Sequence, residues 1–127
     1  MACLHLKHID LTHLTSSHAN AVEKTADGDY LISARFCNTI YKIFRDNGTI
    51  AWRLGGKFSD FHMDFNFSGQ HDVRIISENS TTTILSLFDN ASDDKGRQNA
   101  TSDASSAKVM VLHTASHNKT AKVSAPL

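Results

Sequence analysis

The chain has 127 residues, which is long enough for one ordinary domain with a sizeable core. Thirteen basic and thirteen acidic residues cancel at neutral pH, and the aromatic residues are not interleaved with a basic run. The composition therefore gives no electrostatic reason to expect nucleic acid or a membrane surface as a partner.

Residues 1–17 are expected to form an irregular leader. Polar and charged side chains between His5 and Asp10 interrupt any apolar run, so the segment does not have the pattern of a signal peptide. Its histidines lack the spacing and the accompanying carboxylates or thiols of a metal site. Cys3 and Cys37 likewise lack the spacing of a metal or redox pair, and we expect two free thiols.

Residues 18–57 are predicted to form four short strands joined by tight turns. The dipeptides D-G at 27–28 and N-G at 47–48 separate apolar runs, and such pairs suit two-residue hairpin turns because glycine adopts positive φ at little cost. Side chains alternate along a strand, so Leu31 and Ile32 face opposite sides, and apolar residues on both faces predict a sheet that is covered on both sides. The expected strands of this antiparallel meander are 21–24, 29–35, 39–44 and 49–54.

The following segment carries the same pattern at an offset of 53 residues. His18 falls on His71, and Leu31 falls on Ile84. A repeated four-stranded meander that buries both faces is the unit of a β-propeller. Two blades leave a sheet face uncovered at each end, because such units depend on their neighbours for burial, so we interpret the chain as a fragment of a longer propeller. The expected strands of the second blade are 71–77, 82–89, 108–114 and 120–125.

The predicted fold is therefore all-β, a β-propeller fragment of two four-stranded antiparallel blades behind an irregular leader. A connection rich in phenylalanine joins the blades. We expect its rings to pack over a blade edge, with an aromatic acceptor pocket as the alternative. The predicted organisation is a leader at 1–17, a first blade at 18–57, a connection at 58–69 and a second blade at 70–127 with a polar loop at 90–107.

Five motifs follow one another along the two predicted blades. They are H-x-N-x-V-E-K-x-x-D-G-D-Y-L-I-S-A-R (18–35), T-I-Y-K-I (39–43), W-R-L-G-G-K (52–57), F-N-F-S-x-Q-H-D (65–72) and S-L-F-D-N-A (86–91). Their order resembles the fungal branch of the arylsulfotransferase (ASST-like) family. Bacterial members are six-bladed propellers that move sulfate from a phenolic ester to another phenol through a sulfated histidine, without a nucleotide donor. The resemblance implies a phenolic sulfate donor and a phenol acceptor as partners, and no cofactor.

Three residues in these motifs suit sulfuryl transfer. A neutral imidazole at His71 is nucleophilic near neutral pH. Arg35 presents a planar, permanently charged fork that matches two sulfate oxygens, and His18 can stabilise an oxygen or act as a general acid. If the offset is a blade repeat, both histidines begin inner strands of adjacent blades, and Arg35 converges on them at the mouth of the channel. The resemblance assigns the same three residues to the catalytic set.

The same residues have other interpretations. A histidine that begins a blade strand often only hydrogen-bonds the backbone of a neighbouring blade, and Arg35 has Asp29 and Asp46 as candidate ion-pair partners. Bacterial members of the family also have a histidine directly after the motif arginine, where this chain has Phe36. The sequence therefore leaves three hypotheses: an enzyme fragment that is inactive by itself, a non-catalytic propeller that binds ligands, and an inactive truncated gene product.

Asparagine usage points to a cellular location. Six of the eight asparagines lie in N-x-S/T sequons, where chance would give roughly one or two. Such enrichment predicts a full-length parent that enters the secretory pathway and carries glycans on its surface. The sequons begin at Asn47, Asn66, Asn79, Asn90, Asn99 and Asn118.

Overall fold

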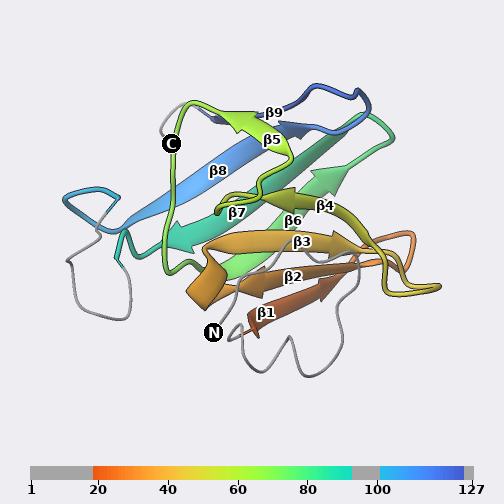
Figure 1. Ribbon diagram of the computed structural model, residues 1–127, viewed down its shortest axis with the longest axis horizontal. Coiled ribbons are helices and arrows are strands. Elements are labelled where there is room, and N and C mark those ends of the chain that lie inside the picture. The colour runs from red at the N-terminus through yellow and green to blue at the C-terminus, as the bar shows by residue number, and fades with distance from the viewer. Residues whose placement is uncertain (1–18, 93–100, 125–127) are drawn as a thin grey trace.

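A computed structural model describes residues 19–92 and 101–124 of the chain. The predicted leader and His18 lie outside the described residues, as does part of the polar loop. Over the described ranges the chain is all-β, as predicted, with nine strands and one short 3-10 turn, η1 (Arg35–Cys37). These residues contain no helix of the length and apolarity that a membrane span needs. Figure 1 shows two sheets packed against each other, without closure into a ring.

The first sheet is the predicted antiparallel meander, in the order β1-β2-β3-β4. Gly28 and Gly48 have φ angles of 88° and 73° in the β1–β2 and β3–β4 turns. Both turns therefore use the left-handed region in which glycine carries no steric penalty. The strands are β1 (Ala19–Lys24), β2 (Tyr30–Ala34), β3 (Thr39–Ile43) and β4 (Ile50–Leu54).

The second sheet has five strands in the order β5-β9-β8-β7-β6. Its last four strands form the expected antiparallel meander, and β5 joins the outer edge parallel to β9. The segment that we expected to be the connection between the blades thus contains a strand. Burial explains it, because Phe61 in β5 is 5% exposed and packs edge-to-face on Trp52, with ring centroids 5.3 Å apart. The strands are β5 (Phe61–Met63), β6 (His71–Glu78), β7 (Thr82–Asp89), β8 (Ser106–His113) and β9 (Lys119–Val123).

Apolar side chains cover both faces of the first sheet, as the alternation predicts. Leu31 joins the core between the two sheets with Leu85 and Leu112, whereas its neighbour Ile32 belongs to a separate cluster on the opposite face. Each such fully buried side chain contributes about 1.5–3 kcal/mol relative to an exposed one. Phe67 of the connection also enters the core between the sheets.

Polar contacts hold β1 and β3 beside β6. Asn20 Nδ2 donates to the carbonyl of Gln70 at 2.7 Å, and the amide of Ile75 donates to Glu23 Oε2 at 2.7 Å. A further contact along β6 joins Lys42 to Glu78 at 3.3 Å. The inner strands of the two sheets are therefore fixed in register with each other, which decides which side chains meet at their ends.

Cys37 differs from the prediction. The sequence suggested a free thiol, whereas the structure records Cys37 in a disulfide. Its position explains the error: Cys37 lies in the buried cluster on the outer face of the first sheet, where spacing along the chain says nothing about which thiol is near. The other cysteine of the sequence, Cys3, lies outside the described residues.

Candidate active site

The residues of the candidate active site lie at the end of the molecule where β2 and β7 end. Arg35 directly follows β2, His71 begins β6, and Asn90 directly follows β7. Because β2 and β7 run towards this end and β6 runs away from it, the three residues meet although they are far apart in the sequence. Figure 1 shows this end at the left, where η1 lies and the arrow of β7 points.

Arg35 and His71 contact each other across the junction of the two sheets. The guanidinium Nη1 of Arg35 lies 3.0 Å from Nε2 of His71. Both side chains are half-buried, so the pair is partly shielded from water and still open to a ligand. A guanidinium only donates hydrogen bonds, so Nε2 accepts and carries its lone pair.

The second ring nitrogen of His71 faces Asn90. The side-chain amide nitrogen Nδ2 of Asn90 lies 2.8 Å from Nδ1, and a 180° turn of the amide exchanges its nitrogen and its oxygen at this position. A neutral imidazole carries one proton, and Nε2 has none when it accepts from Arg35, so Nδ1 is the protonated nitrogen. Nδ1–H needs an acceptor, and the amide of Asn90 provides one when it is turned by 180°, so that its oxygen rather than Nδ2 faces Nδ1. The arrangement holds the tautomer in which Nε2, the nitrogen beside the guanidinium, is nucleophilic.

Backbone strain gathers at the same end. Among the described residues three non-glycine residues have positive φ: Asn38 at 51°, Asp72 at 53° and Ala91 at 55°. Asp72 follows His71 and Ala91 follows Asn90, and Asn38 caps η1. Asparagine and aspartate adopt this region more readily than other non-glycine residues, so the cost of about 1–2 kcal/mol applies mainly to Ala91, and such strain clusters at functional sites. The strained Ala91, directly after Asn90, therefore supports a functional interpretation of this end.

A buried carboxylate fixes the strands behind the pair. Asp89 is fully buried, and its Oδ1 accepts from the amides of Ser68 at 3.0 Å and Ala91 at 2.8 Å. Its Oδ2 pairs with Lys108 Nζ at 2.9 Å. The carboxylate thus joins the approach to β6 with the end of β7, one residue away from Asn90.

Two of the three predicted site residues are brought together. Arg35 and His71 are in contact, and His18 lies outside the described residues. The competing carboxylates Asp29 and Asp46 contact Arg45 instead. Sequence reasoning missed Asn90: it is the penultimate residue of the S-L-F-D-N-A motif, but the sequence drew attention to it only as a sequon.

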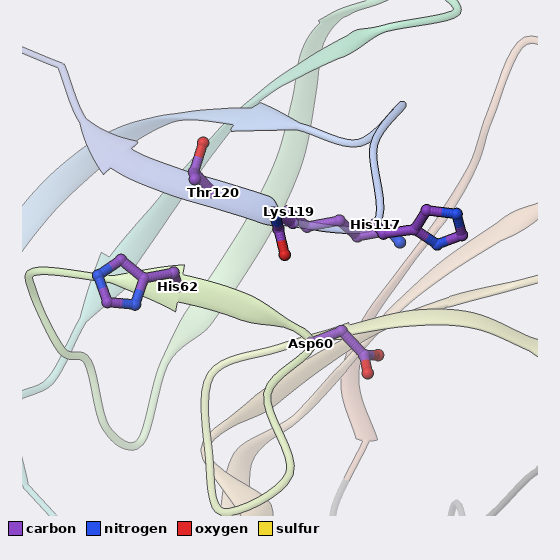
Figure 2. Close-up of a pocket in the computed structure, with 6 residues that line it drawn as sticks. Asp60, His62, His117, Lys119 and Thr120 are labelled. Carbon is purple, nitrogen blue, oxygen red and sulfur yellow. The ribbon is translucent and has the colours of Figure 1, made fainter.

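A surface hollow of about 430 Å³ at the junction of β5 and β9 does not form a competing site. In Figure 2 the side chains of His62 and His117 point away from each other. The side chains of Thr120 and Asp60 also point in opposite directions. Asp60 is already paired, because its Oδ2 accepts from the amide of Arg53 at 2.7 Å. No set of three or more candidate ligands for a metal ion occurs among residues 19–92 and 101–124.

Comparison with known protein families gives a match. The family model described as Arylsulfotransferase (ASST) matches residues 11–126 of the chain, which is nearly its whole length. No curated protein and no solved structure matches the chain.

Proposed function

We propose that this chain, which belongs to the arylsulfotransferase (ASST) family, forms two blades of a larger propeller. The proposed activity of that propeller is the transfer of sulfate from a phenolic sulfate ester to a phenol. The motif order between residues 18 and 91 supports the fungal branch of the family. The proposed catalytic residues are His71 as nucleophile, Arg35 as the anion-binding group and His18 as a general acid.

In the first step Nε2 of His71 attacks the sulfur of the donor. The new N–S bond forms as the bond between sulfur and the phenolic oxygen breaks, and the bonding electrons leave on the phenolate. A general acid protonates that oxygen, and His18 is the proposed donor of the proton. Arg35 turns its N–H groups from Nε2 to the oxygens of the sulfuryl group, which lie within its reach once sulfur has bonded to Nε2.

In the second step the hydroxyl of the acceptor phenol attacks the same sulfur. The N–S bond breaks, its electrons return to Nε2, and a base takes the phenolic proton. His18 gave its proton to the leaving phenolate in the first step, and its unprotonated form is the base in the second step. Donor and acceptor therefore exchange sulfate with no net change in the protein. Neutral Nε2 is then ready for another donor.

The observation that carries this proposal is the 3.0 Å contact between Arg35 Nη1 and His71 Nε2. It sets a permanent positive charge beside the nitrogen that would hold the sulfuryl group. The Nδ1–H tautomer adds support, because it leaves that nitrogen with the lone pair that attack requires.

The proposed location is the secretory pathway. The side chains of Asn47, Asn79 and Asn118 are exposed in the turns after β3, β6 and β8. All three turns lie at the end of the sheets opposite to Arg35 and His71, so glycans on them would leave the proposed site open. Secretion of the parent protein with glycans released by peptide N-glycosidase tests the location, and a sugar-free cytosolic protein would contradict it.

The test of the function is a half-reaction, since sulfation of His71 needs fewer groups than turnover. The chain is incubated with excess 4-nitrophenyl sulfate, and its peptides are analysed by mass spectrometry at neutral to alkaline pH. We expect one added SO₃ on the peptide that contains His71, and none in His71→Gln. His113→Gln, which changes an exposed histidine at the opposite end of β8, is the matched control and should retain the modification. A folded chain without modification at His71 would contradict the proposal.

A further inference from the structure

We propose that Gln70 is a positioning residue that sets the distance between Arg35 and His71. The inference rests on the proposed function for its catalytic consequence. Gln70 directly precedes His71 and is fully buried, although it belongs to neither hydrophobic cluster. Its side chain leaves the second sheet and binds the first.

The amide of Gln70 spans three acceptors of the first sheet. Nε2 lies 3.0 Å from Ser33 Oγ, and 3.3 Å from each of the carbonyl oxygens of Ala34 and Thr39. Carbonyl oxygens only accept, so the nitrogen of the amide must face them. Ala34 is the residue before Arg35, and the side chain therefore joins the residue before the guanidinium to the residue before the imidazole.

The backbone around Gln70 is held in the same way. Its carbonyl accepts from Asn20 Nδ2 at 2.7 Å, and the amide of Gly69 donates to Asn38 Oδ1 at 2.8 Å. Asn20 lies in β1 and Asn38 caps η1, so both partners come from the first sheet. The start of β6 is thus fixed to the first sheet on both sides of the Gln70 side chain.

Packing alone does not explain a glutamine at this position. Within the part of the chain that the structure describes, Oε1 of Gln70 is buried without a hydrogen-bond partner, and an unpaired buried acceptor costs free energy. An apolar side chain of the same length would avoid that cost, but it would leave Ser33 Oγ and the carbonyls of Ala34 and Thr39 without this donor. The amide is better explained by the geometry that it imposes, because small displacements of reacting groups lower rates severely.

The test compares Gln70→Met and Ser33→Ala with the unchanged chain. Gln70→Met keeps the length and removes the donor, and Ser33→Ala removes only the nearest acceptor. Two quantities are measured: the ¹⁵N chemical shifts of the His71 ring, which report the tautomer, and the rate at which 4-nitrophenyl sulfate modifies His71. We expect Gln70→Met to lose the preference for Nδ1–H and to slow sulfation by about tenfold or more, with a smaller change of the same sign in Ser33→Ala.

Thr83→Val is the matched control. Thr83 is buried in the second sheet and its hydroxyl donates to Glu78 near the opposite end, so the variant loses a buried hydrogen bond without touching the pair. It should leave the tautomer and the rate unchanged. If folded Gln70→Met and folded Ser33→Ala both keep the wild-type tautomer of His71 and the wild-type rate of sulfation, the proposal is overturned.

The two proposals fail differently. If the unchanged chain holds the Nδ1–H tautomer and is never sulfated, the proposed function fails, and the ring shifts of the two variants alone decide the role of Gln70. If the unchanged chain is sulfated and the variants match it, the positioning role fails and the function stands.

Discussion

Asn90 contacts His71 at 2.8 Å on the ring nitrogen opposite to the one that Arg35 contacts, so residues from the two sheets hold the imidazole from both sides. Replacing Asn90 by alanine removes the acceptor for Nδ1–H, and one hydrogen bond is worth about 1 kcal/mol. Sulfation of His71 should slow by about fivefold to tenfold. Asn90→Asp keeps an acceptor and should retain the rate, measured by the initial rate of 4-nitrophenyl sulfate modification.

Ser92→Ala is the control for that experiment, because it removes the same sequon without changing the contact to His71. It should behave like the unchanged chain. Equal rates in Asn90→Ala and Ser92→Ala would show that the tautomer does not depend on Asn90.

The buried pair of Asp89 and Lys108 should stabilise the fold strongly. Asp89→Ala leaves Lys108 without its carboxylate and two backbone amides without their acceptor, so we expect a loss of about 3 kcal/mol in the free energy of unfolding. Urea titration measures it. Arg74→Gln is the comparison, because the pair of Arg74 with Asp72 has the same 2.9 Å separation but is exposed. Breaking it should lower the free energy of unfolding by less than about 1 kcal/mol. Equal losses would contradict the importance of burial.

Gly55 tests the close approach of β4 to the connection. At its φ of +81°, an added Cβ would lie 2.5 Å from Phe67 Cζ and 2.8 Å from the carbonyl oxygen of Asn38. Gly55→Ala should therefore cost about 2 kcal/mol or more in unfolding free energy. Gly28→Ala has a similar φ of +88° but meets only the flexible side chain of Arg45, so its loss should be about 1 kcal/mol. A thermal shift assay compares them, and a smaller shift for Gly55→Ala would be contrary to this account.

Tyr41 should make stability depend on alkaline pH. Burial raises the pKa of Tyr41 above its ordinary value of 10.0, and the hydrogen bond with Thr39 and the charge of Arg53 offset only part of that rise. The folded state therefore retains the phenolic proton longer than the unfolded state does. This contribution is fully present below about pH 10 and is lost as pH rises through the folded-state pKa.

Urea midpoints between about pH 9 and about pH 11 measure this dependence. The midpoint of the unchanged chain should fall faster than that of Tyr41→Phe, which lacks the titrating group. Tyr30→Phe changes an exposed ring and should follow the unchanged chain. Parallel curves for all three proteins would contradict the raised pKa.

The sheets could be predicted because their signals are local. Gly28 and Gly48 mark turns, and the alternation of Leu31 and Ile32 assigns each side chain to a face, so the strands needed no information from elsewhere in the chain. The short strand β5 could not be predicted in this way. It forms because Phe61 packs on Trp52 and because β9, far away in the sequence, offers a free edge.

The site was predictable only in part for the same reason. Arg35 and His71 have side chains whose chemistry identifies them in a motif. Asn90 and Gln70 are neutral amides, and their importance comes from partners that only the packing of two sheets reveals. Cys37 shows the same limit, since a disulfide depends on proximity in space.

The most direct test of the central claim is the position of the sulfuryl group on the ring of His71. Fragmentation of the modified peptide, with both synthetic sulfohistidine isomers as standards, distinguishes the two ring nitrogens. The contacts of Arg35 and Asn90 predict the Nε2 isomer, formed more slowly in Arg35→Lys because the planar fork is lost. Modification at Nδ1, or on a residue other than His71, would contradict the account.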